Sequence, residues 1–172
     1  MGHQTAVIMP AFRSVRHAEV EVETTDDSFA VSMSPNKLVG CRLLTGRLPE
    51  GDVPVWFLDQ PQYFDRDSLY GTPDGDYPDN AERFAFFCRA ALLAIERIGW
   101  SVDIVHCNDW QSGLVPALMA AQQRRWMKKA ATIFTIHNIA YQGQFSKDAF
   151  RWTGLDWKHF NHNEFEYYDQ LN

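Results

Sequence analysis

Two short apolar runs separated by a helical pattern constrain the fold more than any other feature of this sequence. The runs are "VDIVHCND" at 102–109 and "ATIFTIHN" at 131–138, and "GLVPALMAAQQRRW" at 113–126 lies between them with Pro116 in its first turn. Strands that are apolar on both faces and alternate with helices are typical of a parallel sheet that helices cover on both faces. The sequence therefore predicts an α/β fold with right-handed crossovers.

Polar residues follow each apolar run at once. His106, Asn108 and Asp109 end the first run, and His137 and Asn138 end the second. In an open α/β sheet the ligand crevice lies outside the carboxyl ends of the strands, so we expect these five residues to share one rim. Their donors and acceptors suit a hydroxyl-rich ligand such as a sugar, and Asp109 supplies a fixed negative charge.

Structural roles remain open for the same residues. Asp109 could instead cap the helix that starts near Ser112, which is the commonest role of an Asp between a strand and a helix. His137 could be a histidine that only bonds a neighbouring carbonyl group, and His106 is expected to be structural.

The rest of the chain divides into a β-rich first third and one long helix. The run "QTAVIMP" at 4–10 predicts a strand, and alternating stretches with turn signals over 17–58 predict further strands. A polar loop at 69–80 precedes apolar residues at helical spacing. Asp79 and Glu82 have capping-box spacing, which predicts the start of this helix, and Gly99 predicts its end.

Charge and cysteine content exclude several classes of partner. The net charge of -6 is spread along the chain, so no basic surface for nucleic acid or an anionic membrane is predicted. The longest apolar stretch falls far short of the roughly 20 residues of a membrane span. Three cysteines without metal or disulfide spacing favour a reducing compartment, which predicts a cytoplasmic protein.

Sequence signatures of other chemistries are missing. We find no HExxH or paired CxxC, and the two histidines of "HFNH" at 159–162 have no obvious third ligand, so no metal and no cofactor is expected. There is no GxSxG for a nucleophilic serine, Cys107 lies in an apolar strand, and neither GxGxxG nor a P-loop is present.

Five segments in a fixed order resemble one enzyme family. They are "YFDRDSLYG", "DYPDNAERFAFFCRAAL", "VDIVHCNDWQSGLVPALM", "TIFTIHNIAYQGQF" and "FEYYDQLN". Together they make the chain similar, from about Gln4 to its end, to bacterial glycogen synthases and plant starch synthases. The resemblance implies a retaining glucosyltransferase that moves glucose from ADP-glucose to the non-reducing end of an α-1,4-glucan. It also implies a GT-B fold of two Rossmann-like domains, of which residues 1–172 would form a single, partial N-terminal domain.

The resemblance also implies roles for individual residues. His137 matches the histidine that contacts the donor glucose near its reacting carbon, Asp109 matches an aspartate that lines the same sugar site, and Tyr77 matches a loop tyrosine implicated in activity. The substrate-binding residues implied in the same way are Asn138, Asn108, Tyr141 and Gln142. Asn108 and Gln111 stand where many relatives have histidine, a difference that starch synthases also show.

Parts of that family's catalytic unit have no counterpart in the sequence. The first strand with its Lys-Thr-Gly-Gly loop and the C-terminal nucleotide-binding domain are both missing, so we expect the isolated chain to be inactive as a synthase. An unpaired sheet edge would also favour self-association. Two alternatives stay open: a non-catalytic glucan-binding module that uses the rings of Tyr70, Tyr77 and Trp110, and an unrelated flavodoxin-like domain, against which the missing phosphate loop argues.

Overall fold

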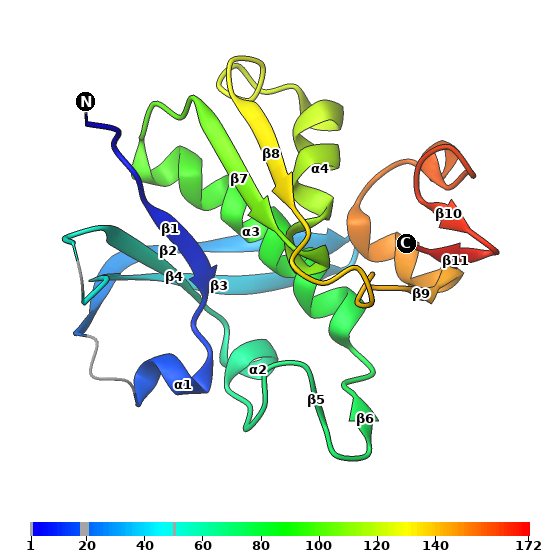
Figure 1. The fold of residues 1–172 in the computed structure, drawn as a ribbon, viewed down its shortest axis with the longest axis horizontal. Helices are drawn as coiled ribbons and strands as arrows, with labels where there is room; N and C mark the ends of the chain where they lie inside the picture. Colours follow the sequence, from blue (N-terminus) through cyan, green and yellow to red (C-terminus); the bar gives the residue numbers. More distant parts are fainter. Residues whose placement is uncertain (1, 18–20, 50) are drawn as a thin grey trace.

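The first part of the chain forms a mixed four-stranded sheet. The computed structural model describes residues 2–17, 21–49 and 51–172, so positions 18–20 and 50 of the predicted β-rich region lie outside the described residues. The sheet has the order β1-β4-β3-β2, with the bounds Val7–Pro10 (β1), Val22–Ser34 (β2), Lys37–Arg47 (β3) and Pro54–Asp59 (β4). β1 pairs with β4 in parallel, and the other neighbours are antiparallel (Figure 1). The β-rich first third is confirmed, although its first strand begins at Val7 rather than Gln4.

The two apolar runs form a second sheet with a helix between its strands. Its elements are β7 (Ile104–Asn108), α4 (Leu114–Gln122) and β8 (Ala131–Thr135). The strands are parallel, with Asn108 opposite Thr135, so the predicted strand-helix-strand unit is present. The expected burial on both faces is not found here, because Ile104, Ile133 and Phe134 are 56%, 46% and 43% exposed.

A groove of about 770 Å³ lies between the two sheets. β1 lines one side and β7 the other, and Figure 1 shows both strands running in the same general direction. Within the part of the chain that the structure describes, β1 and β7 each have one strand neighbour. Each strand therefore keeps one edge of backbone N–H and C=O groups without a strand partner.

α3 (Asn80–Ile98) packs against the first sheet and α4 and contributes much of the core. Its inward-facing side chains are buried, with Phe86 and Ala90 fully so. A smaller cluster of Ala11, Leu44, Val55 and Phe57 packs on the opposite face of the first sheet. The helix ends at Gly99 with φ 73°, as predicted, because glycine adopts the left-handed conformation at little cost.

The start of α3 is where predicted, but the capping-box prediction is wrong. Asp79 makes no cap hydrogen bond, and its carboxylate instead accepts two hydrogen bonds from Arg66, at 2.7 and 2.5 Å. Glu82 accepts hydrogen bonds from the Lys37 ammonium and the Tyr63 hydroxyl. Charge-assisted bonds with cationic donors compete successfully with the helix N-terminus for these carboxylates.

α4 is shorter than the predicted helix. Pro116 lies in its first turn as predicted, but Gln123 adopts a left-handed φ of 46° and ends the helix. Trp126, which the pattern placed in the helix, donates its indole N–H to Glu96 of α3 at 3.0 Å. Tertiary contacts thus override the local helix preference of this segment.

The C-terminal segment forms a small unit that the sequence did not predict. Its sheet has the order β10-β11-β9, and its elements are β9 (Phe145–Ser146), the 3-10 helices η2 (Lys147–Thr153) and η3 (Trp157–His159), β10 (Glu166–Tyr167) and β11 (Gln170–Leu171). Phe150 is fully buried and contacts the rings of Trp157, Phe160 and Phe165, with centroids 4.9 to 5.8 Å apart. Aromatic packing, and not strand length, therefore holds this unit together.

The remaining elements are short. They are α1 (Arg13–Arg16), α2 (Pro61–Phe64), β5 (Gly71–Thr72), β6 (Gly75–Asp76) and the 3-10 helix η1 (Trp110–Ser112). Among the residues that the structure describes, no helix combines the length and apolar character needed to cross a bilayer.

Candidate functional site

The carboxyl ends of β7 and β8 bring Asn108, Asp109 and His137 together, as expected from the sequence. The Asp109 carboxylate accepts the backbone N–H of His137 at 2.7 Å. His137 Nε2 lies 3.0 Å from Asn108 Oδ1. With the Asn108 amide assigned this way, Nε2 is the donor, because an amide oxygen only accepts.

Asp109 adopts a backbone conformation that is rare for residues with a side chain, with φ 56° and ψ 177°. Its N–H donates to the carbonyl of Thr135 at 2.9 Å, which fastens it to β8. Such a conformation costs about 1–3 kcal/mol and persists where its surroundings fix it. The helix-cap alternative is wrong, because the carboxylate makes no cap bond, and the Ser112 hydroxyl donates to the Asn108 and Asp109 carbonyls at 2.8 and 3.1 Å.

His106 and Asn138 serve the local structure of the rim. His106 Nε2 lies 2.8 Å from Thr135 Oγ1 on the neighbouring strand, which is the structural role expected for it. Asn138 accepts the N–H of Ala140 on Oδ1 at 3.0 Å and the N–H of Tyr141 on its carbonyl at 3.1 Å. Asn138 therefore shapes the turn that leads from β8 to Tyr141 and Gln142.

A cavity of about 320 Å³ opens beside Asp109. Tyr141 and Gln142, two of the predicted substrate-binding residues, line it, and Tyr141 is 70% exposed. Most of its other walls are apolar, among them Phe84, Trp110, Leu114, Ile139 and Phe145. Of the residues in the described ranges, no Lys or Arg lines it. The cavity can accept a ring or the C–H face of a sugar, with few polar contacts to orient it.

Gly143 allows the turn after β8 to approach Trp110 closely. Its φ is 67°, and a Cβ at this position would lie 2.6 Å from the indole ring. Trp110 also packs against Phe84 and Phe145, with ring centroids 4.9 and 5.4 Å apart. Trp110 is therefore fixed between α3, β9 and this turn, and forms a rigid wall beside Asp109.

Comparison with known proteins decides the family. The whole chain, residues 1–172, matches the family described as the starch synthase catalytic domain. The chain belongs to that family. The resemblance inferred from the five sequence segments is thereby confirmed.

Relatives of this starch synthase-family chain include bacterial enzymes. It is 58% identical over 181 residues to the glycogen synthase of Rhodopirellula baltica, covering 99% of the chain and 36% of that protein. It is 42% identical over 174 residues to glycogen synthase 2 of Geobacter sulfurreducens, covering 100% and 35%. The chain thus spans little more than a third of the length of these relatives.

A solved structure confirms the fold of this starch synthase-family chain. The catalytic domain of starch synthase IV from Arabidopsis thaliana, bound to ADP and acarbose, matches it with a TM-score of 0.84 and 28% identity. The match covers 99% of the chain and 35% of the plant protein. The chain therefore has the α/β architecture of one part of a GT-B starch synthase catalytic domain.

The loop before α3 places Tyr70 next to the rim. The Tyr70 ring lies 5.9 Å from that of Phe84 and 6.4 Å from that of Trp110. Burial and, secondly, the negative charge of Asp109 raise the pKa of Tyr70. The charge of the carboxylate that anchors His137 therefore acts on the Tyr70 hydroxyl.

Tyr77 takes a different position in the same loop. Its ring lies 4.6 Å from the Arg66 guanidinium and 5.4 Å from that of Arg83. Within the described ranges, no hydrogen bond or ring contact joins Tyr77 to Asp109 or His137. The catalytic role that the resemblance implied for Tyr77 stays a prediction, and the ring of Tyr70 is the part of this loop that packs near Trp110, the residue after Asp109.

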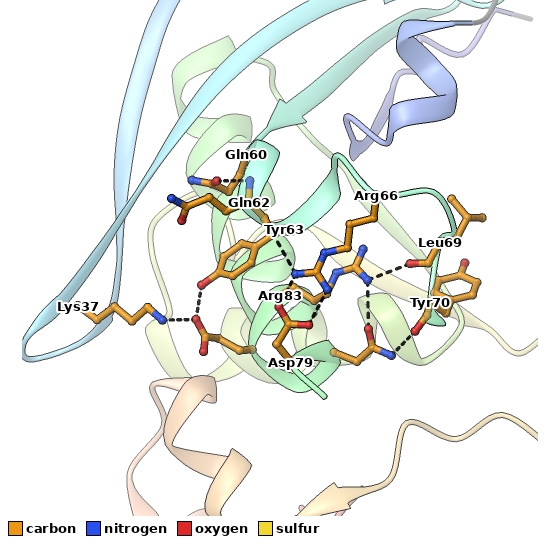
Figure 2. A network of polar contacts seen from close by, with 11 residues as sticks. Lys37, Gln60, Gln62, Tyr63, Arg66, Leu69, Tyr70, Asp79 and Arg83 are labelled. Carbon is orange, nitrogen blue, oxygen red and sulfur yellow. Dashed lines mark hydrogen bonds and ion pairs between the residues drawn. The ribbon is translucent and has the colours of Figure 1, made fainter. Parts of the chain in front are cut away.

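Sequence reasoning missed Arg83, which lies at the centre of a polar network under this loop (Figure 2). Its side chain is 0% exposed, and burial lowers the pKa of the guanidinium to about 10. A signal was present in the sequence, because Arg83 stands among the apolar positions of α3 next to Phe84. A charged residue on the buried face of a helix is uncommon unless it has a specific partner.

Cysteine and metal chemistry find no support in the described part of the chain. Burial raises the pKa of Cys107 to about 11 and those of Cys41 and Cys88 to about 12, so the thiols stay neutral. No group of three or more His, Cys, Asp or Glu side chains in these ranges is placed to hold a metal ion. His159 of the "HFNH" pair contacts Glu164 at 2.6 Å instead.

Proposed function

We propose that this chain is the N-terminal part of a glycogen or starch synthase, a retaining glucosyltransferase that moves glucose from ADP-glucose to the non-reducing end of an α-1,4-glucan. The contacts among Asn108, Asp109 and His137 carry the proposal, because they fix three polar groups at the edge of the sheet where α/β folds bind ligands. The glycogen synthases named above and the starch synthase IV complex with ADP and acarbose support it.

The proposed chemistry assigns a task to each residue of the rim. Transfer from a nucleotide sugar passes through an oxocarbenium-like transition state, which needs groups that fix the sugar hydroxyls and cations that neutralise the leaving diphosphate. Asp109 and Asn108 would hold hydroxyl groups, and His137 would contact the donor glucose near its reacting carbon. Tyr141 and Gln142 would bind substrate in the adjoining cavity, beyond the turn shaped by Asn138.

The cations for the diphosphate must come from elsewhere. No Lys or Arg in the described ranges lines the cavity beside Asp109, and Arg66 and Arg83 are engaged under the loop. A developing negative charge would therefore have no partner at this rim. We propose that the purified 172-residue chain transfers no glucose by itself, and that a radiolabel assay with ADP-glucose and glycogen gives no product above background.

A chimeric enzyme tests the role of the rim. This chain would replace the matching segment of the Rhodopirellula baltica glycogen synthase, to which it is 58% identical. We expect the chimera to be active and His137→Ala to lower kcat by about 10²-fold or more, the usual effect of losing one group that stabilises the transition state.

The matched control for that experiment is His106→Ala. It removes a second exposed histidine, whose ring contacts the Thr135 hydroxyl and makes no hydrogen bond with Asn108 or Asp109 within the described ranges. Its kcat should stay within about twofold of the parent chimera, as for most surface substitutions. Equal losses in the two variants would contradict the assignment of His137.

A glucan-binding module without catalysis is the second candidate. The rings of Tyr70 and Trp110 lie 6.4 Å apart, and the exposed Tyr141 stands near Trp110 in the wall of the same cavity, an arrangement that suits stacking on sugar faces. Electrophoresis of the chain through a gel that contains glycogen separates the candidates. Retardation of the isolated chain combined with an inactive chimera would favour the module.

We also propose a cytoplasmic location. The three cysteines are free and buried, and a chain with unpaired thiols suits a compartment that keeps thiols reduced. Fractionation of the native cells with an antibody to this chain tests the proposal, and recovery in the periplasmic or extracellular fraction would contradict it.

A further inference from the structure

We propose that Arg83 is a positioning residue that holds the loop of residues 69–80 so that Tyr70 stands beside Asp109 as a further wall of the sugar site. The inference rests on the proposed function only for the nature of the ligand. The placement of Tyr70 by Arg83 is a matter of geometry and can be tested without a sugar.

Arg83 is a buried cation that has no carboxylate partner among the described residues. Its side chain is 0% exposed, and Nε and Nη2 have no hydrogen-bond partner in these ranges. The neighbouring carboxylate of Asp79 is engaged by Arg66 instead. Burying a charge in this way is unfavourable, so packing alone does not explain an arginine here, since an apolar side chain of similar length would fill the space.

The hydrogen bonds of Arg83 go to both ends of the loop. Nη1 donates to the carbonyl of Leu69 at 3.0 Å and to Oδ1 of Asn80 at 3.1 Å. Asn80, which is 1% exposed, links Arg83 to Tyr70, because its Nδ2 donates to the carbonyl of Tyr70 at 2.8 Å. That carbonyl also accepts the N–H of Tyr77 at 2.9 Å. One guanidinium thus fixes the backbone on either side of Tyr70 (Figure 2).

Aromatic rings hold the guanidinium in place. Its centre lies 4.9 Å from the ring centroid of Phe84, 5.3 Å from that of Phe64 and 5.4 Å from that of Tyr77. Cation–π contacts of this kind offset part of the cost of desolvation. The planar group therefore has one orientation, in which Nη1 points to the loop.

The loop presents Tyr70 to the rim. The Tyr70 ring is packed against Phe84 and Trp110, and Trp110 is the fixed wall beside Asp109. Tyr70 is 41% exposed, so part of the residue remains accessible to a ligand. Tyr70 and Trp110 come from segments far apart in the sequence, and the buried network under the loop brings their rings together.

Titration of Tyr70 in the full 172-residue chain tests the inference. Tyrosinate absorbance follows the titration, and the difference from Tyr70→Phe assigns the signal. Burial and the charge of Asp109 raise the pKa of Tyr70, whereas the charge of Arg83 lowers it. In Arg83→Met, a Tyr70 that stayed in place would show a higher pKa because the cation is gone. We expect the opposite, a fall toward the ordinary tyrosine value of about 10, because the ring leaves Asp109.

Two further variants sharpen this experiment. Asp109→Asn should lower the pKa of Tyr70 in the parent chain and have no effect in the Arg83→Met background, because the two groups are then no longer neighbours. Arg89→Met is the matched control, since Arg89 is a partly buried arginine of the same helix that donates to the carbonyls of Met33 and Trp152. It should leave the titration of Tyr70 unchanged.

Asn80→Ala tests the positioning of Tyr70 independently of the charge of Arg83. It cuts the link to the Tyr70 carbonyl and keeps Arg83, so we again expect the pKa of Tyr70 to fall. An unchanged or higher pKa in a folded Arg83→Met or Asn80→Ala chain overturns the proposal. Failure of both variants to fold also overturns it, because Arg83 would then be a general structural residue.

The chimeric enzyme tests whether Tyr70 forms a wall of the sugar site. Tyr70→Ala and Arg83→Met should lower kcat/KM by similar factors, and the double variant should lose no more than either one, because both changes remove the same wall. If the factors by which the two single variants lower kcat/KM multiplied in the double variant, the proposal that Arg83 acts through Tyr70 would be overturned. If the parent chimera is inactive but the pKa of Tyr70 falls as expected in Arg83→Met, only the proposed function is rejected. If the chimera is active but the pKa of Tyr70 does not fall in Arg83→Met, only this inference is rejected.

Discussion

Gly143 packs tightly against the Trp110 ring beside the candidate site, and Gly143→Ala should destabilise the chain. The new Cβ would lie 2.6 Å from the indole, and the residue would have to keep a φ of 67°. The left-handed backbone costs about 1–2 kcal/mol for alanine, and overpacking adds about 1–3 kcal/mol. Urea unfolding followed by tryptophan fluorescence measures the total.

Gly99→Ala separates the two contributions. Gly99 has a similar φ of 73°, but nothing lies within 4 Å of the place that a Cβ would take, so only the backbone cost of about 1–2 kcal/mol applies. If both substitutions lowered the free energy of unfolding equally, Trp110 would not be packed as described.

Single residues of the site were predictable where they follow an apolar strand. His137, Asn108 and Asp109 end their runs, and the parallel register of β7 and β8 brings them to one edge. Whether Asp109 caps a helix or binds a neighbour was not predictable, because both need the same residue type at the same spacing. The role of Arg83 was not predicted because its partners, the Leu69 carbonyl and the Asn80 amide oxygen, are uncharged and do not appear in a charge pattern.

At the scale of elements, the Arg66–Asp79 pair joins the loop before α3 to the segment that follows α2. Burial acting alone would raise the pKa of Asp79, but the hydrogen bonds and charge of Arg66 outweigh it, so this pKa lies below its ordinary value. Such a carboxyl stabilises the fold above its unfolded pKa of about 3.9. The contribution is lost as the pH falls through the folded pKa.

Asp79→Asn should therefore destabilise the chain in a pH-dependent manner. We expect a loss of about 1 kcal/mol at neutral pH, the usual value of a partly exposed pair, and a difference from the parent that shrinks toward zero at about pH 2. Asp52→Asn is the control, because the Arg47–Asp52 pair is mostly exposed and should matter little at either pH. Urea unfolding at both pH values measures the effect, and a loss that persists in acid would contradict the ion-pair explanation.

Elements with a long, regular pattern were predictable, and short ones were not. The apolar spacing predicted the helix α3 and the two apolar runs predicted the strands β7 and β8, each at about the right place. Gly99 predicted the C-terminal end of α3. The end of α4 was missed because the contact of Trp126 with Glu96 is tertiary. The C-terminal strands have two residues each, too few for any periodicity, and depend on the packing of Phe150.

At the scale of the whole molecule, the free edges of β1 and β7 make self-association an expected property of the chain. Unpaired strand edges with exposed apolar side chains template pairing with a second copy. Ile104, on the β7 side of the groove, is 56% exposed. We expect sedimentation velocity to show concentration-dependent assembly of the purified chain.

A charge on the edge should suppress this assembly. Ile104→Lys should shift the chain toward monomer, because edge lysines block strand pairing. Leu38→Lys is the matched control, since Leu38 is 73% exposed but lies on β3, away from the groove. If both lysine variants dissolved the assembly equally, general surface hydrophobicity and not the β7 edge would be responsible.

The hydrogen bond between Asp109 and position 137 has a practical consequence. Because the carboxylate binds the main-chain N–H, its hold does not depend on which side chain stands there. Any residue except proline, which lacks that donor, preserves the anchor. Substitution at position 137, even by an unnatural amino acid carrying a reporter group, therefore removes the ring contact with Asn108 but keeps the backbone anchor to Asp109.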